Sequence, residues 1–166
     1  MPAGATYEPI ATVSPTSSPF EFTSIPATYT DLRVIVSVLT SVAGSGITMQ
    51  INNDTGTNYS QTDLNGDGTS ATSNTTSNDD RWYLTGVTAN TTSTTIPLLQ
   101  VIDIFAYAGS TNKTGLITHS GDKNGSGRVA RRVALWRSTS AITSLKFFIT
   151  NVTTGTTATL YGIKAA

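Results

Sequence analysis

One short segment has the ligand spacing of a calcium-binding loop. In Asp63–Gly68, oxygen-bearing side chains stand at the first, third and fifth places and glycine at the sixth, as in the loop of a helix–loop–helix calcium site. The twelfth place holds Asn74 instead of a bidentate glutamate, and neither flank has a helical pattern. The alternative is a glycine-rich hairpin turn, because Asn-Gly and Asp-Gly are strong turn formers. We favour the hairpin, and calcium binding by this segment is left open.

The single histidine, His119, stands beside Ser120 and close to Asp122. Neighbouring residues at a strand end do not give the nucleophile, base and orienting geometry of a catalytic triad. No G-x-S-x-G sequence presents a serine. One histidine without cysteine cannot build the usual zinc sites either. We therefore expect a solvent-facing histidine at a strand end and no metal or other cofactor.

Carboxylates are few, and most lie in turn-like segments where turn chemistry explains them. A glycosidase needs two carboxylates about 5–10 Å apart across a sugar. Glu21 and Asp103 are the pair to test for such an activity. Asp103 interrupts an apolar run, so it is expected on an exposed face or beside a buried partner. Because no acid–base pair can be assembled from the sequence, the chain is predicted not to be an enzyme.

Basic and aromatic residues offer two further hypotheses. Strand alternation places Arg131 and Arg132 on opposite faces, where either could form an ion pair with Asp103 or with a neighbouring subunit. The Gly125–Gly127 turn before them resembles an anion cradle, but no helix follows it. The aromatic candidates are Trp82, Tyr83 and Trp136. They form either a sugar-stacking platform or, as is more common for such residues, anchors in the core or in an interface.

The composition excludes several classes of protein. Only 12% of the 166 residues are charged, the formal net charge is zero and cysteine is absent. A nucleic-acid-binding protein would need a basic excess. Threonine and serine together supply about three residues in ten, and threonine suits a half-solvated strand. No apolar run approaches the roughly 20 residues of a membrane span, and the first residues lack the basic and apolar regions of a secretory signal.

The elements that position these residues are predicted to be short strands between turns. We expect a single all-β domain over residues 1–166, a two-sheet antiparallel β-sandwich with jelly-roll topology. Residues 1–5 form an N-terminal arm in this interpretation, and residues 69–80 form a long exposed loop. The predicted strands are Tyr7–Val13, Phe20–Ile25, Leu32–Thr40, Ile47–Asn52, Arg81–Val87, Ile96–Tyr107, Thr114–His119, Val129–Arg137, Ser144–Val152 and Thr157–Ile163.

Two of these strands, Leu32–Thr40 and Ser144–Val152, are apolar on both faces. A sandwich strand needs only one apolar face. Ile35, Leu39 and Phe148 therefore predict a second buried surface, which is either a subunit interface or a strand covered by a long loop. The candidate interface residues are Ile35, Leu39, Phe148, Arg131 and Arg132.

Several segments, taken as a set, resemble small virion proteins of tailed bacteriophages, particularly cyanophages. These segments are Tyr7–Ala11, Phe22–Leu32, Asn52–Ser60, Leu135–Ser144 and Thr159–Ala166. These segments are structural motifs and carry no catalytic residue. The segment Asp63–Asp80 is the part of the chain that resembles the family least.

The resemblance implies a virion structural protein on the capsid surface, synthesised in the host cytoplasm. The first expectation is a capsid decoration, or cement, protein: a homotrimer that binds the major capsid protein and stabilises the shell by mass action. The alternative is a tail-fibre or tail-tip protein that recognises host polysaccharide. Neither function implies binding to nucleic acid or to a membrane.

Overall fold

In the computed structural model, which describes residues 6–85, 93–122 and 124–164, the chain is built of β-strands. No helix long and apolar enough to span a membrane occurs in these ranges. The strands are β1 (Tyr7–Val13), β2 (Phe20–Phe22), β3 (Asp31–Val38), β4 (Ile47–Ile51), β5 (Tyr59–Gly66), β6 (Ala71–Asp79), β7 (Trp82–Tyr83), β8 (Leu98–Phe105), β9 (Lys113–Gly121), β10 (Arg128–Trp136), β11 (Leu145–Ile149) and β12 (Thr157–Ile163).

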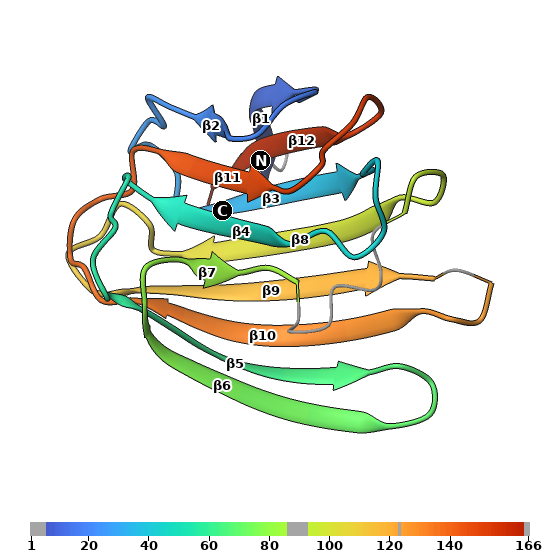
Figure 1. Ribbon diagram of the computed structural model, residues 1–166. Coiled ribbons are helices and arrows are strands. Elements are labelled where there is room, and N and C mark those ends of the chain that lie inside the picture. Colours follow the sequence, from blue (N-terminus) through green and yellow to red (C-terminus); the bar gives the residue numbers. More distant parts are fainter. Residues whose placement is uncertain (1–5, 86–92, 123, 165–166) are drawn as a thin grey trace.

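Two antiparallel sheets pack face to face (Figure 1). The large sheet has the order β1-β12-β3-β8-β9-β10-β5-β6, and the small sheet has the order β2-β11-β4-β7. The predicted all-β fold with two antiparallel sheets is confirmed, and each of the ten predicted strands has a counterpart. The predicted N-terminal arm lies outside the described residues, as does the end of the predicted strand Arg81–Val87.

The core lies between the small sheet and the strands of the large sheet that it covers. Strand β3 shows the pattern: Leu32, Val34 and Val36 are fully buried, while the residues between them are half-buried. Burial of such a side chain stabilises the fold by about 1.5–3 kcal/mol. Trp82 of β7 joins the two sheets, since its ring lies over Gly115 and its Nε1–H donates to the Leu135 carbonyl at 3.0 Å. A side chain at position 115 would overlap this ring.

The prediction of a loop over residues 69–80 is wrong, because Ala71–Asp79 forms the edge strand β6. Its side chains are mostly exposed, so it needs no apolar residue on either face. Threonine suits this position through its β-branched side chain. Its partner β5 was also not predicted, and the two strands form a hairpin through the turn that follows Gly66.

Candidate functional site

Strands β9, β10, β5 and β6, hereafter the extension, carry the large sheet past the edge strand β7 of the small sheet (Figure 1). Here the inner face, which is turned toward the small sheet, becomes polar. The cross-strand neighbours Gln100 and His119 are buried on this face, and so are Arg132 and its neighbour Asp63. The inner face of the extension thus combines buried polar side chains with buried apolar ones such as Ile117 and Trp136.

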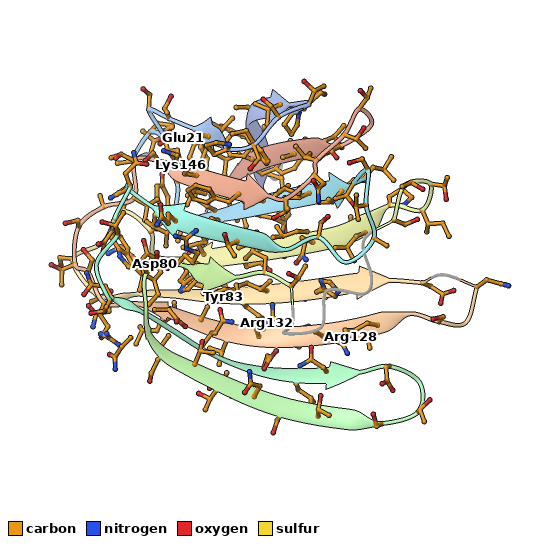
Figure 2. All side chains as sticks on the ribbon, viewed as in Figure 1. Glu21, Asp80, Tyr83, Arg128, Arg132 and Lys146 are labelled. Atoms are coloured by element: carbon orange, nitrogen blue, oxygen red, sulfur yellow. The ribbon has the colours of Figure 1, made fainter. Side chains whose placement is uncertain are left out.

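The centre of this polar region is a buried ion pair. Arg132 Nη2 lies 2.9 Å from Asp63 Oδ2, and the side chains are 1% and 5% exposed. Asn65 Nδ2 donates to the same carboxylate oxygen at 2.9 Å, while Arg132 Nη1 donates to the Tyr83 carbonyl at 2.7 Å. Burial lowers the pKa of the Arg132 guanidinium, and the hydrogen bonds that the guanidinium donates to Asp63 oppose that change. The pair ties β10 and β5 of the large sheet to β7 of the small one (Figure 2).

His119 is buried rather than solvent-facing, so the prediction for this residue is wrong. It is 1% exposed and shares a hydrogen bond of 2.7 Å with Gln100 through Nδ1. Burial lowers the pKa of His119 to about 4, and the nearby charges of Arg132 and Arg128 act in the same direction. Burial therefore keeps the imidazole in its neutral form at neutral pH.

A pocket of about 440 Å³ lies between the small sheet and the extension. Arg132 and Asp63 form part of its wall, and Gln61, Asp79 and Tyr83 also line it. The Tyr83 side chain is exposed. The backbone N–H of Tyr83 donates a hydrogen bond to Gln61 Oε1 at 3.0 Å. Sequence reasoning identified Tyr83 but not Gln61 or Asp79, because β5 and β6 have no apolar pattern that would reveal them as strands.

The outer face of the large sheet, turned away from the small sheet, carries five exposed apolar side chains, with polar residues such as Ser120 of β9 between them. These five side chains, hereafter the outer patch, are all more than two-fifths exposed and occupy β5, β8 and β10: Leu64 (60%), Val129 (59%), Val133 (52%), Leu99 (42%) and Phe105 (42%). Arg131 stands among them opposite Leu64. An exposed apolar group of this kind is uncommon on a sheet that faces water.

The predicted interface residues fall in different places. Ile35 and Arg131 lie on the outer face, as alternation predicts for Arg131, whereas Arg132 is buried against Asp63. Leu39 is half-buried and packs near the turn at Gly155. Phe148 lies on the outside of the small sheet, half-buried, with the Arg81 guanidinium 5.1 Å from its ring. The structure therefore brings Ile35 and Arg131 to one surface, without Leu39 or Phe148.

The carboxylates considered for sugar hydrolysis are not a pair. Asp103 lies on the outer face of the large sheet, where Arg33 Nε contacts its Oδ1 at 2.5 Å. Glu21 lies on the outside of the small sheet, opposite Lys146 (Figure 2). Two carboxylates on opposite sides of a sandwich cannot act on one glycosidic bond. The ion-pair partner of Asp103 is Arg33, which the sequence prediction did not include.

The segment Asp63–Gly68 is the end of β5 followed by a turn, as the hairpin interpretation predicted. Asp63 points to Arg132, whereas Asp67 accepts hydrogen bonds from the backbone of Thr69 and Ser70. These backbone bonds lower the pKa of Asp67. The carboxylates therefore face different partners, and the described residues contain no cluster of three or more metal-binding side chains.

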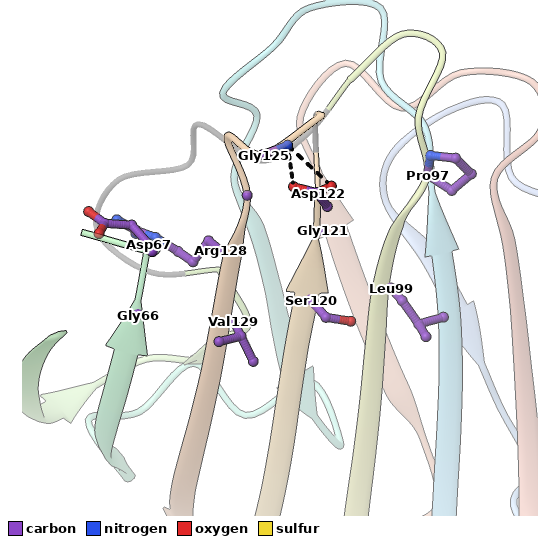
Figure 3. Close-up of a pocket in the computed structure, with 12 residues that line it drawn as sticks. Gly66, Asp67, Pro97, Leu99, Ser120, Gly121, Asp122, Gly125, Arg128 and Val129 are labelled. Atoms are coloured by element: carbon purple, nitrogen blue, oxygen red, sulfur yellow. Dashed lines mark hydrogen bonds between the residues drawn. The ribbon is translucent and has the colours of Figure 1, made fainter. Parts of the chain in front are cut away.

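A second, shallow pocket of about 580 Å³ lies at the sheet end near Asp67 and Gly125 (Figure 3). There the Gly125 N–H donates to Asp122 Oδ1 at 3.0 Å, so the proposed anion cradle already holds a carboxylate of its own chain. Lys123 lies outside the described residues. Of the aromatic candidates, Trp82 and Trp136 are in the core, which leaves Tyr83 at the surface.

Comparison with protein-family models, with curated proteins and with solved structures gave no match.

Proposed function

We propose that the chain is a non-enzymatic structural subunit of a tailed-phage virion, a capsid decoration protein that attaches through the outer face of its large sheet. The observation that carries the proposal is the outer patch. The particle itself is inferred from the resemblance of the sequence segments to small virion proteins. Binding only to the assembled shell would stabilise that shell by mass action.

The chemistry of the outer face indicates what its partner must offer. Removing apolar surface from water contributes about 25 cal/mol per Å², and the outer patch distributes this surface over the strands β8, β10 and β5. Arg131, in its midst, forms no ion pair among the described residues. The face therefore fits a partner surface that is apolar and carries a carboxylate. A shell protein or a different face of a second copy, as in a cyclic trimer, meets this requirement.

The strand order supports a jelly roll as the finer description of the fold. The first four strands of the large sheet, β1-β12-β3-β8, face the four of the small sheet, β2-β11-β4-β7. The extension is then two added hairpins, β5–β6 and β9–β10. Jelly rolls occur in viral capsid proteins and in lectins, which is an argument from analogy.

The experiment is co-sedimentation of the purified chain with shells assembled from the major capsid protein of the same phage. Val129→Asp and Val133→Asp together are expected to abolish binding, because they place charge in the outer patch. The matched control is Val42→Asp, since Val42 is also exposed, at 55%, but lies in the loop after β3. Binding that survives the double substitution, or a chain with no affinity for shells, would contradict the proposal.

Recognition of host polysaccharide by a tail-fibre or tail-tip protein is the second candidate function. The exposed Tyr83 ring beside the polar pocket favours it, since an aromatic face can stack on a sugar. The test is whether the purified chain blocks adsorption of the phage to host cells. Blocked adsorption would favour polysaccharide recognition over capsid decoration, and unchanged adsorption would rule out polysaccharide recognition.

A further inference from the structure

The polar pocket has an unusual construction on its β6 side. The ladder between β5 and β6 shifts register between Tyr59 and Ser60, which pair with Asp79 and Ser77. The extra residue is Asn78, which has a positive φ of 58°. Its side-chain oxygen accepts a hydrogen bond from Arg137 Nη2 at 3.0 Å. This is a β-bulge, and bulges commonly redirect a side chain at a functional site.

The bulge brings Asp79 to the pocket. In a regular strand without the bulge, Asn78 would take its place in the alternation and Asp79 would face the side opposite to Thr76. With it, Thr76 and Asp79 both line the pocket. Four buried side-chain atoms of the described ranges have no hydrogen-bond partner, which are Asn65 Oδ1, Thr76 Oγ1, Asp79 Oδ2 and Gln100 Oε1. Buried polar atoms are normally satisfied, and of these four only Thr76 Oγ1 and Asp79 Oδ2 belong to residues that line the pocket.

The remaining wall is held rigidly by hydrogen bonds within the protein. Gln61 and Arg132 bind the backbone N–H and carbonyl of Tyr83, at 3.0 and 2.7 Å. The Arg132 guanidinium is in turn fixed by Asp63. Such pre-organisation reduces the side-chain entropy that the protein must lose when a ligand binds.

We propose that this pocket binds a neutral saccharide unit. The unpartnered hydroxyl and carboxylate oxygens accept hydrogen bonds from sugar hydroxyls, which both donate and accept, and Tyr83 presents an aromatic ring beside them. The volume of about 440 Å³ is within the range of roughly 300–1,000 Å³ for small-molecule pockets. The described lining residues carry one positive side chain, Arg132, and two negative ones, Asp63 and Asp79, and this balance disfavours acidic sugars and other anions.

The inference does not rest on attachment through the outer patch, because the pocket opens on the other side of the large sheet. It deepens the second candidate function by naming a ligand class and a site. A decoration protein with this pocket would also display a saccharide-binding site on the particle. Shell co-sedimentation and saccharide binding can therefore succeed or fail separately.

The experiment is an NMR titration of the ¹⁵N-labelled full chain with glucose, galactose, mannose and N-acetylglucosamine, and with short neutral oligosaccharides. Glucuronic acid and N-acetylneuraminic acid serve as acidic comparators. At least one neutral sugar is expected to shift the backbone signals of residues at positions 61, 76, 79 and 83. Acidic sugars are expected to bind more weakly.

Three variants separate binding from folding. Asp79→Asn and Thr76→Val should each weaken binding about fivefold or more, the effect of one lost hydrogen bond. Thr76→Val should leave the melting temperature unchanged or raise it, because the hydroxyl has no partner in the free protein. The control is Asp122→Asn, because Asp122 is an exposed turn aspartate at the other pocket. This variant should bind neutral sugars as tightly as the unchanged protein does. The inference is overturned if no neutral sugar binds at millimolar concentration, if acidic sugars bind more tightly, or if Asp79→Asn and Thr76→Val bind like the unchanged protein.

Discussion

Protonation of His119, the single histidine of the chain, should destabilise the protein as the pH falls below about 6.5. Burial lowers the pKa of His119 from its usual 6.5 to about 4 in the folded protein. Between these values the unfolded chain binds the proton and the folded protein does not, so the free energy of unfolding falls as the pH falls. Stability from this residue is complete above about pH 7 and decreases below 6.5.

The size of the effect follows from the two pKa values. Their difference corresponds to about 3 kcal/mol at pH values well below 4, at roughly 1.4 kcal/mol for each pKa unit. Between about pH 7.5 and pH 5.5 the same two values give a loss of about 1 kcal/mol. Carboxylates with ordinary pKa values stay ionised over that interval, and His119 is the single histidine of the chain.

The assay is urea unfolding at the two pH values, followed by tryptophan fluorescence and far-UV circular dichroism. Coincident transitions by the two probes would justify a two-state treatment. His119→Gln keeps a polar side chain at the site and should abolish most of the pH dependence, whatever its effect on stability at pH 7.5. The reasoning is refuted if the unchanged protein is equally stable at both pH values, or if His119→Gln retains the full loss.

Two further substitutions test the packing of the site and of the sandwich. Arg132→Met should lower the free energy of unfolding by about 3–5 kcal/mol, because it leaves the Asp63 carboxylate buried beside only Asn65, and adding Asp63→Leu should restore most of the loss. Urea unfolding of the single and the double variant measures these changes in the free energy of unfolding. An Arg132→Met variant as stable as the unchanged protein would show that the pair is not buried. Gly162→Ala should cost about 1–3 kcal/mol by overpacking, since a Cβ there would lie 2.3 Å from the Tyr29 ring. An unchanged melting temperature for this variant would place Tyr29 elsewhere.

Sequence patterns predicted the strands that bury an apolar face and missed those that do not. Strand β3 was evident because Leu32, Val34 and Val36 alternate with other residues, and the small sheet covers that face. Strand β6 has no large apolar residue, and the inward residues of β5 after Tyr59 are polar. No periodicity signals such strands. Strand β5 is held by backbone pairing with β10 and by the ion pair of Asp63 with Arg132, and β6 is held by backbone pairing with β5. Sequence reasoning did not identify that ion pair.

The same limit applies to the candidate site. Alternation correctly separated Arg131 from Arg132, because the alanines and valines of β10 mark the two faces. It did not place His119, since both faces of β9 carry one large aliphatic residue, Leu116 on one and Ile117 on the other. Asp79 depends on a bulge at Asn78, which nothing in the local sequence announces. The pocket therefore emerges only when the extension is folded against the small sheet.

Cryo-electron microscopy of the particle that carries this chain would show directly whether the outer face of the large sheet is an assembly surface. Leu64, Val129 and Val133 are expected to be covered by a neighbouring subunit, with a carboxylate of that neighbour beside Arg131. A map in which this face is open to solvent while the protein is attached through another surface would contradict this expectation.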